Sequence, residues 1–209
     1  WLIMLPGPPR ELRPMFTDTV APLLQQVLPV ASGFVCRTLR TTGVGESVVQ
    51  EKIGGPLQRW VDAGLDLGYC ARPGQVDVRL AVRGGGAEQQ VREAEAVVRE
   101  LLGPHIYGVE DEALETVIVR LLTERKATLA LAESCTGGCI ANRITNVPGA
   151  SVVLLAGLVT YSNAAKQKFL GVQAETLAQH GAVSEPVARE MAEGARRQTQ
   201  ASYALSVTG

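Results

Sequence analysis

The stretch ATLALAESCTGG, residues 127–138, decides the fold of the second half of the chain. Residues 127–132 are almost all apolar, which is typical of a strand that is buried on both faces of a parallel sheet. The two glycines that follow, Gly137 and Gly138, let the backbone turn sharply and approach a ligand closely. The stretch therefore predicts a buried strand that turns directly into a helix, with Ser134 at the turn.

Strands and helices alternate around this stretch. Apolar residues recur at helical spacing from Leu114 to Leu122, so an amphipathic helix is expected before the strand. Such alternation is typical of a mainly parallel sheet with helices on both faces, and we predict a three-layer α/β domain over residues 110–209. The elements expected after the turn are a helix Thr136–Asn146, a strand Ser151–Tyr161, helices Ala164–Leu170, Ala174–Gln179 and Glu185–Gln198, and a strand Tyr203–Val207.

The middle of the chain, residues 33–108, shows a shorter pattern that repeats once. A strand, a helix and a strand are followed by a strand, a helix and a short strand, which is a split β-α-β unit in duplicate. The segment RPGQ, residues 72–75, supplies the turn between the two central strands. This predicts a small two-layer α+β domain with elements Phe34–Thr41, Glu46–Ala63, Leu65–Ala71, Val76–Val82, Ala87–Leu102 and a short strand near Ile106.

Residues 1–29 are too few to form a domain. We expect the end of a strand at Trp1–Leu5, a loop at Pro6–Pro9 and a short helix through Phe16 and Leu24. The apolar run at the start needs a sheet to bury it, and the chain begins inside this run. We therefore interpret the segment as the last part of a domain whose body lies upstream.

The composition argues against several classes of protein. Apolar residues make up 46% of the 209 residues, which is enough for packed cores. Twenty Lys and Arg oppose 21 Asp and Glu without a block of like charges, so neither nucleic acid nor a membrane is the expected partner. The apolar stretches fall short of the roughly 20 residues that span a bilayer. Four cysteines without CxxC spacing and two histidines argue against a metal site, and they favour free thiols in the cytoplasm.

Ser134 lies where a helix N-terminus is expected. The unpaired N–H groups of such a turn attract an anion, which is either a phosphate or the oxyanion of an acyl-transfer transition state. Ser134 is then a candidate nucleophile at the mouth of the turn. The alternative is that Ser134 or Thr136 only caps the helix, which is the usual role of Ser and Thr at this position.

A second cluster, TYSNAAK at residues 160–166, follows the next strand of the same sheet. Asn163 is expected to cap the helix, and Lys166 lies on the first turn, where its side chain can point toward the strand ends. A lysine that is desolvated beside positive helix ends has a lowered pKa and can accept a proton from a serine hydroxyl. Ser134 and Lys166 are therefore a candidate pair of nucleophile and base.

Residues beside these two clusters leave alternatives open. Cys135 competes with Ser134 as nucleophile, because a thiol near a helix N-terminus is easily activated. Tyr161 either holds Lys166, passes a proton to a leaving amine, or is a plain aromatic residue at a strand end. Glu133 either accepts hydrogen bonds from the turn or orients Lys166.

Four motifs in this order resemble the C-terminal domain of the CinA family of competence/damage-inducible proteins: LAESCTGG (131–138), VTYSNAAK (159–166), HGAVSEP (180–186) and SVTG (206–209). LPGPPRE, residues 5–11, is similar to the end of the molybdopterin-binding-like N-terminal domain of that family, so residues 1–29 look like a remnant of it. Residues 33–108 resemble the KH-like middle domain. The resemblance covers the whole chain.

This resemblance implies that residues 110–209 hydrolyse nicotinamide mononucleotide to nicotinate mononucleotide and ammonia without a metal or other cofactor. It places the family's serine, lysine and tyrosine at Ser134, Lys166 and Tyr161. The family continues past Gly209 into a loop and a strand that help to complete the site. The expected substrate-binding residues are Glu133, Cys135, Thr136, Gly137, Gly138, Asn163, Thr208 and Gly209.

The resemblance also bears on the other two segments. The N-terminal domain of full-length relatives looks like a metal-dependent ADP-ribose pyrophosphatase, of which only the last loop is expected here. The middle block has no GxxG step, which argues against nucleic-acid binding of the KH kind, and we expect a spacer or a dimerisation module. A cytoplasmic homodimer is expected. The alternatives to the deamidase are a nucleotide-binding regulatory module, in which the glycine-rich turn only holds a phosphate, and a protein-interaction scaffold that uses residues 33–108.

Overall fold

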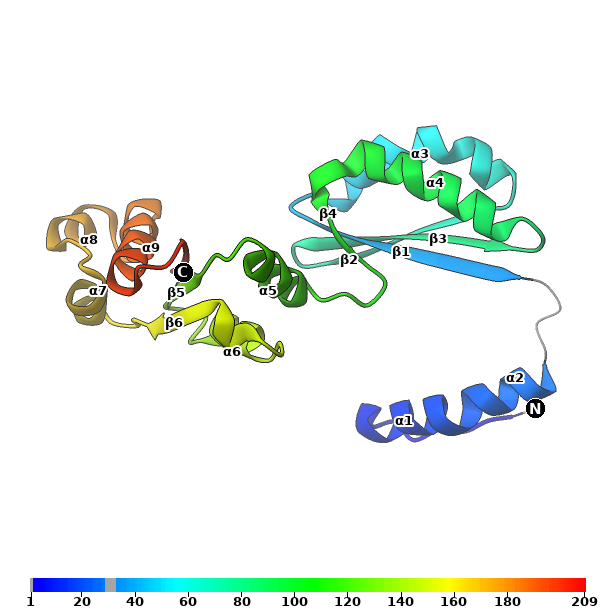
Figure 1. Cartoon of the computed structure of the whole chain (residues 1–209), viewed down its shortest axis with the longest axis horizontal. Coiled ribbons are helices and arrows are strands. Elements are labelled where there is room, and N and C mark those ends of the chain that lie inside the picture. The colour runs from blue at the N-terminus through cyan, green and yellow to red at the C-terminus, as the bar shows by residue number, and fades with distance from the viewer. Residues whose placement is uncertain (1, 29–32) are drawn as a thin grey trace. The chain divides into compact units, whose positions relative to one another are not determined.

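The chain folds into two compact units, residues 1–110 and 111–209 (Figure 1). The computed structural model describes residues 2–28 and 33–209. Each unit contains its own β-sheet. Within the described ranges, no helix has both the length and the apolar character needed to cross a membrane.

Residues 2–28 are mainly helical. Three helical segments follow one another without a break: α1 (Pro9–Met15), a π-helical turn (Phe16–Val20) and α2 (Ala21–Val27). They confirm the helix expected through Phe16 and Leu24. The strand expected at Trp1–Leu5 is wrong for residues 2–5, and the first residue lies outside the described ones. Leu2 and Met4 are 85% and 83% exposed, and none of the described strands pairs with this segment, so its backbone has no ladder to join.

The first unit contains a four-stranded antiparallel sheet and two long helices. In chain order its elements are β1 (Phe34–Thr42), α3 (Glu46–Asp62), β2 (Asp66–Arg72), β3 (Gln75–Arg83), α4 (Ala87–Leu102), a 3-10 turn (Gly103–His105) and β4 (Ile106–Val109). The strand order is β2-β3-β1-β4. Both helices lie on one face of this sheet and share a core with it (Figure 1). This confirms the predicted split β-α-β unit in duplicate.

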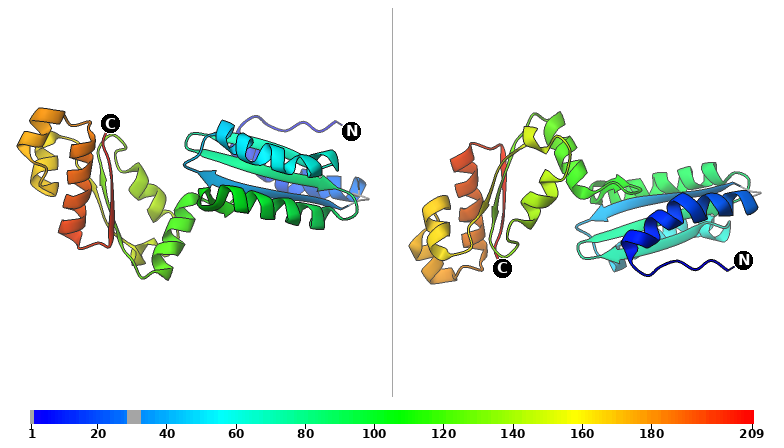
Figure 2. Two further views of the ribbon diagram at one scale, coloured as in Figure 1. Left: turned by 90° about the horizontal axis from the view of Figure 1, so that it is seen from above. Right: turned by 90° about the horizontal axis from the view of Figure 1, so that it is seen from below.

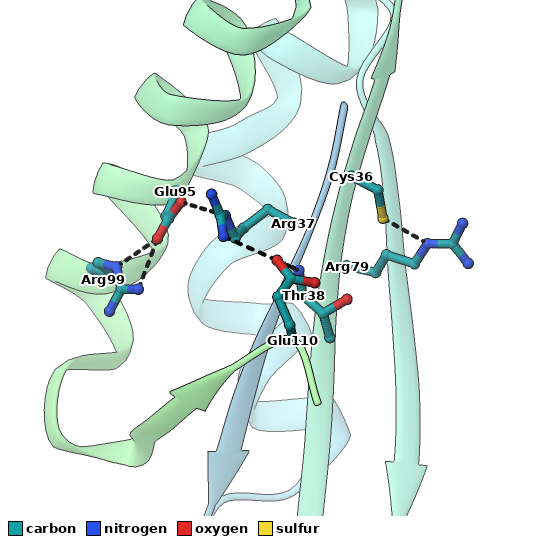
Figure 3. Close-up of polar contacts among 7 residues, drawn as sticks. All are labelled: Cys36, Arg37, Thr38, Arg79, Glu95, Arg99 and Glu110. Atoms are coloured by element: carbon teal, nitrogen blue, oxygen red, sulfur yellow. Dashed lines mark hydrogen bonds and ion pairs between the residues drawn. The ribbon is translucent and has the colours of Figure 1, made fainter. Parts of the chain in front are cut away.

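Side chains of β1 alternate between the two faces of this sheet. Arg37 points to the helix-covered side, where its guanidinium contacts Glu95 of α4 at 3.2 Å and Glu110 at 3.0 Å (Figure 3). Glu110 also donates its backbone N–H to the carbonyl oxygen of Thr38 at 2.9 Å. The last residue of the first unit is therefore fastened to β1.

The second unit is a three-layer α/β structure. Its elements are α5 (Leu114–Glu124), β5 (Leu129–Glu133), α6 (Cys139–Thr145), a 3-10 turn (Ala150–Val152), β6 (Leu154–Val159), α7 (Asn163–Leu170), α8 (Ala174–His180), α9 (Glu185–Thr199) and β7 (Tyr203–Val207). The sheet is parallel in the order β6-β5-β7. One apolar cluster joins it to α7, α8 and α9, and a second joins it to α5 and α6 on the opposite face (Figure 2, left). The predicted three-layer fold is confirmed.

Two predicted boundaries in this unit are wrong. The helix expected from Thr136 begins at Cys139, because Gly137 and Gly138 adopt φ angles of 59° and 94°, which are left-handed and interrupt a right-handed helix. The strand expected at Ser151–Tyr161 is shorter at both ends. The residues around Ser151 form a 3-10 turn, and the strand ends at Val159, where the chain turns toward α7.

The helices α7 and α9 pack backbone against backbone. A Cβ at Gly194 of α9 would lie 1.9 Å from the carbonyl oxygen of Leu170, the last residue of α7, so only glycine fits there. Arg197, one turn further on, donates from Nη2 to the same oxygen at 3.3 Å. This contact fixes the spacing of the two helices, and α7 carries Lys166.

Gly194→Ala is therefore expected to lower the stability of the chain. The added methyl group collides with backbone atoms, and overpacking of this kind costs about 1–3 kcal/mol, so the midpoint of thermal unfolding falls by several degrees. The matched control is Gly54→Ala within α3, where an added Cβ meets nothing within 4 Å. That change should be neutral or stabilising by about 0.5–1 kcal/mol. Equal midpoints for wild type and Gly194→Ala in circular dichroism would contradict the packing described.

Candidate active site

Ser134 and Lys166 meet beyond the carboxyl ends of β5 and β6. Lys166 Nζ lies 2.9 Å from Ser134 Oγ, within hydrogen-bond distance. Both side chains are buried, with 7% of Ser134 and 1% of Lys166 exposed. Ligands of open parallel sheets gather at this edge, because the loops that follow the strands converge there. The structure thus brings together the two residues that the sequence pairs.

The amine of Lys166 is surrounded by oxygen atoms that carry no full charge. Besides Ser134, its neighbours are the carbonyl oxygens of Thr160 at 2.9 Å and Tyr161 at 3.2 Å. Burial lowers the pKa of Lys166, and the nearby Cys135 thiol, when ionised, opposes this shift in part. A neutral amine has two N–H groups for the two carbonyls and one lone pair for the proton of the Ser134 hydroxyl. The arrangement therefore suits a neutral base that accepts a proton from serine.

The start of α7 places Lys166 at this point. Ser162 is the N-cap of the helix, and its Oγ accepts a hydrogen bond from the N–H of Ala165 at 3.1 Å. The cap expected at Asn163 is wrong by one residue, because Asn163 is already the first helical residue and its side chain is exposed. Side chains of a helix point toward its N-terminus, so Lys166 reaches back to the strand ends.

Glu133 points to the opposite face of the sheet from Ser134. Its carboxylate accepts hydrogen bonds from the N–H groups of Ile140 at 3.0 Å and Ala141 at 2.8 Å, which are the second and third residues of α6. Burial alone raises the pKa of Glu133, but the hydrogen bonds that its carboxylate accepts from the turn and from the start of α6 outweigh it and hold the pKa below its ordinary value. Glu133 therefore caps α6 and does not orient Lys166.

The turn after Ser134 keeps unpaired N–H groups. The cap residue of α6 is Gly138, so the alternative that Ser134 or Thr136 caps this helix is wrong. Ser134 donates its N–H to the carbonyl oxygen of Val207 at 2.9 Å. In the part of the chain that the structure describes, the N–H groups of Cys135 and Thr136 donate to no acceptor. Two donors that directly follow a serine can stabilise an oxyanion formed on its substrate.

The remaining predicted site residues lie at different distances from this centre. Cys135 is exposed, and Gly209 lies beside it, since a Cβ on Gly209 would be 3.3 Å from the Cys135 Sγ. The Thr208 hydroxyl donates to the carbonyl oxygen of Ala182 at 2.8 Å. Tyr161 contacts Lys166 through its backbone carbonyl, while its side chain is 73% exposed.

Thr160 is a site residue that the sequence reasoning did not single out. It is 1% exposed, it supplies a carbonyl oxygen to Lys166, and its hydroxyl has no hydrogen-bond partner among the described residues. Its position directly after β6 was the available signal, because residues that follow a parallel strand lie at the edge where ligands bind. No group of three or more potential metal ligands occurs within residues 2–28 and 33–209.

Two family models match the chain. Residues 111–209 match the CinA C-terminal domain, and residues 36–108 match the KH domain of damage-inducible protein CinA. A putative competence-damage inducible protein of Symbiobacterium thermophilum is 45% identical over 216 residues, covering 100% of this chain and 49% of the relative. A CinA-like protein of Akkermansia muciniphila is 44% identical over 207 residues, covering 99% and 48%. The chain thus spans about half the length of these curated relatives.

Solved structures of similar proteins cover a smaller part of the chain. Competence/damage inducible protein CihA from Agrobacterium tumefaciens is 44% identical, covers 46% of this chain and 58% of its own, and has a TM-score of 0.45. A competence-damaged protein (CinA) superfamily protein from Escherichia coli is 36% identical, covers 46% and 55%, and has a TM-score of 0.45.

The burial of Lys166 predicts a pH-dependent part of the stability. The folded state releases the Lys166 proton at a lower pH than the unfolded state, whose lysine has the ordinary pKa of 10.5. The contribution is therefore present above pH 10.5 and is lost as the pH falls through the folded pKa. Lys166→Met removes it, so the stability of this variant relative to wild type should decline as the pH rises over that interval.

Urea unfolding at a series of pH values measures this difference. The matched control is Lys168→Met, which removes an exposed lysine from the same helix and should keep the pH dependence of the wild type. A stability difference between Lys166→Met and wild type that stays constant with pH would contradict the burial of a titrating amine.

Proposed function

The chain belongs to the CinA family, and from this premise we propose that it catalyses the hydrolytic deamidation of nicotinamide mononucleotide to nicotinate mononucleotide and ammonia. The observation that carries the proposal is the 2.9 Å contact between Ser134 Oγ and the buried amine of Lys166. A serine activated by a lysine of lowered pKa is a known solution for cleaving an amide. The substrate is the one that the resemblance to the family implies.

In the proposed first step Ser134 Oγ attacks the carboxamide carbon. Its proton passes to Lys166, and the negative charge on the carboxamide oxygen is held by the N–H groups of Cys135 and Thr136. When the tetrahedral intermediate collapses, the bond from carbon to nitrogen breaks, and Lys166 returns the proton to the leaving nitrogen, which departs as ammonia. An acyl ester on Ser134 remains.

Water completes the proposed reaction. Lys166, again neutral, takes a proton from a water molecule that attacks the ester carbon, and the ester bond to Ser134 Oγ breaks as the serine regains its proton. The product is nicotinate mononucleotide. In a variant of this mechanism Lys166 activates water directly and Ser134 only positions the amide. Mass-spectrometric detection of an acylated Ser134 after rapid quenching supports the first route. Turnover of the substrate without any such adduct supports the second.

Two features favour Ser134 over Cys135 as the nucleophile. The amine of Lys166 contacts Ser134 Oγ directly, whereas no hydrogen bond joins it to Cys135 among the described residues. Cys135 is also exposed, while Ser134 is nearly enclosed, so the serine is in the environment where a lysine stays neutral. Tyr161 holds Lys166 through a backbone atom, so this contact does not depend on its phenol.

The proposal is tested by measuring ammonia and nicotinate mononucleotide released from nicotinamide mononucleotide, with a chain extended past Gly209 on the pattern of the longer relatives. Ser134→Ala and Lys166→Ala are each expected to lower kcat by about 10²–10⁴-fold or more. Cys135→Ala and Tyr161→Phe should stay within several-fold of wild type.

The outcomes separate two classes of function. If a folded, extended wild type releases neither ammonia nor nicotinate mononucleotide, the proposed deamidase activity is wrong. Binding of the nucleotide without turnover would then favour a regulatory module. Loss of activity in Cys135→Ala together with an active Ser134→Ala would transfer the nucleophile to the thiol.

The rate should also rise with pH. Lys166 acts only in its neutral form, so kcat/KM is expected to increase through the pKa of Lys166, which lies below its ordinary value of 10.5. Lys166→Arg keeps a cation of similar length that does not lose its proton, and this rising limb should be absent from its residual activity. A pH profile that is the same in wild type and Lys166→Arg would show that another group supplies the base.

A further inference from the structure

Thr160 carries a buried hydroxyl that has no hydrogen-bond partner among the described residues. Within residues 111–209, all of which the structure describes, four polar or charged residues are buried: Glu133, Ser134, Thr160 and Lys166. The other three have partners, because Glu133 accepts from the start of α6 and Ser134 contacts Lys166. A buried hydroxyl without a partner costs free energy and requires an explanation.

The backbone of Thr160 is fully bonded, so only its side chain is free. The N–H donates to the carbonyl oxygen of Glu133 at 2.8 Å, and the carbonyl oxygen accepts from Lys166 Nζ at 2.9 Å. These two bonds hold the residue between the end of β5 and the start of α7. With 1% of Thr160 exposed, a partner for its hydroxyl has to enter the site itself.

The Thr160 side chain lies on the same face of the sheet as Ser134. Glu133 pairs with Val159 in the parallel ladder, so the residues that follow them, Ser134 and Thr160, are neighbours. Val159 points toward α6, since a Cβ on Gly138 would lie 3.4 Å from its Cγ2. Successive residues of a strand point to opposite faces, so Thr160 points to the other face, where the serine meets the lysine amine.

The proposed deamidase reaction places a spare hydrogen-bond donor at this point, and the inference rests on that proposed function. Lys166 returns a proton to the leaving nitrogen, so this nitrogen has to lie within hydrogen-bond distance of Nζ. It carries two N–H groups of its own. In the second step a water molecule takes its place and gives one proton to Lys166. The other O–H of that water needs an acceptor.

The other neighbours of the amine are already occupied. The carbonyl oxygens of Thr160 and Tyr161 both accept from Lys166. Ser134 Oγ is bonded to the substrate carbon throughout the acyl stage. The phenol of Tyr161 belongs to a residue that is 73% exposed. The Thr160 hydroxyl has free lone pairs and lies on the correct face.

We propose that Thr160 Oγ1 accepts a hydrogen bond from the leaving nitrogen while the acyl ester forms, and from the attacking water while the ester is hydrolysed. Thr160 keeps its own proton in both steps. In the first, the carbon–nitrogen bond breaks and the nitrogen takes a proton from Lys166. In the second, water gives a proton to Lys166 and forms the new carbon–oxygen bond. The hydroxyl thus orients the group that exchanges a proton with the amine.

The depth of the hydroxyl agrees with this role. Thr160 is 1% exposed and Ser134 is 7% exposed, so a group that meets the threonine hydroxyl has already reached the nucleophile. The hydroxyl of Thr136 does not take this role, because it interacts with the carboxylate of Glu133 on the opposite face of the sheet.

Kinetics of the extended chain test the proposal. Thr160→Val removes the hydroxyl and nearly keeps the shape, and kcat for nicotinamide mononucleotide is expected to fall at least about tenfold with little change in KM. Thr160→Ser keeps the acceptor and should stay within several-fold of wild type.

An ester substrate separates the two steps. The methyl ester of nicotinate mononucleotide has a leaving oxygen without a hydrogen to donate, so Thr160→Val should form the acyl ester at nearly the wild-type rate. Its hydrolysis still needs the oriented water and should slow at least about tenfold. Acylated Ser134 is therefore expected to accumulate in this variant, as measured by mass spectrometry after rapid quenching. A purely structural role of Thr160 would slow both steps together.

Thermal unfolding separates a functional hydroxyl from a structural one. The matched control is Thr41 of β1, which is 0% exposed and whose Oγ1 donates to the carbonyl oxygen of Val76 at 2.7 Å. Thr41→Val breaks this bond, so the midpoint should fall by several degrees while kcat stays unchanged. Thr160→Val breaks no bond, so its midpoint should equal or exceed that of wild type.

The outcomes distinguish this inference from the proposed function. A folded wild type that releases no ammonia would refute both. An active wild type with an equally active Thr160→Val would refute the role of Thr160 alone. So would a loss in Thr160→Ser as large as that in Thr160→Val, or a midpoint of Thr160→Val lowered as much as that of Thr41→Val.

Discussion

The second unit depends on one contact, the buried amine of Lys166 between Ser134 Oγ and two backbone carbonyls. Burying a charged amine costs free energy. Burial lowers the pKa of Lys166, so the amine becomes neutral more readily, and the groups that it contacts are a hydroxyl and two carbonyls and not a carboxylate. The contact requires β5 and β6 to end at the same level and α7 to begin one residue after its serine cap. Parallel pairing of the two strands supplies the first condition, and Ser162 supplies the second.

Glu133, the last residue of β5, and Ser134, the residue after it, point to opposite faces of the sheet. Glu133 points toward α6 and satisfies the donors at the start of that helix, while Ser134 points toward α7. The carboxylate that satisfies the N–H groups at the start of α6 comes from the strand. Among the described residues, the N–H groups of Cys135 and Thr136 donate to no acceptor, so the turn keeps two donors for a ligand.

Much of this could be predicted from the sequence, because hydrophobic periodicity specifies both folds and because Ser134 and Lys166 follow neighbouring strands. The errors have local causes. Gly137 and Gly138 shift the start of α6 to Cys139. Ser162 and Asn163 are both residue types that favour the N-cap position, so the sequence alone does not show which of the two caps α7. The direction of Glu133 depends on which face of β5 carries α6.

The contact at Gly194 also bears on how such a chain can change over evolution. The close approach of α7 and α9 requires a position without a side chain, because a Cβ at Gly194 would lie 1.9 Å from the carbonyl oxygen of Leu170. The apolar side chains around this contact can be substituted by others of different size, because cores tolerate such changes when their total volume is kept. Such substitutions leave the position of α7, the helix that carries Lys166, unchanged. The position of the Lys166 amine therefore depends little on most core substitutions and strongly on Gly194, which lies on a different helix, α9.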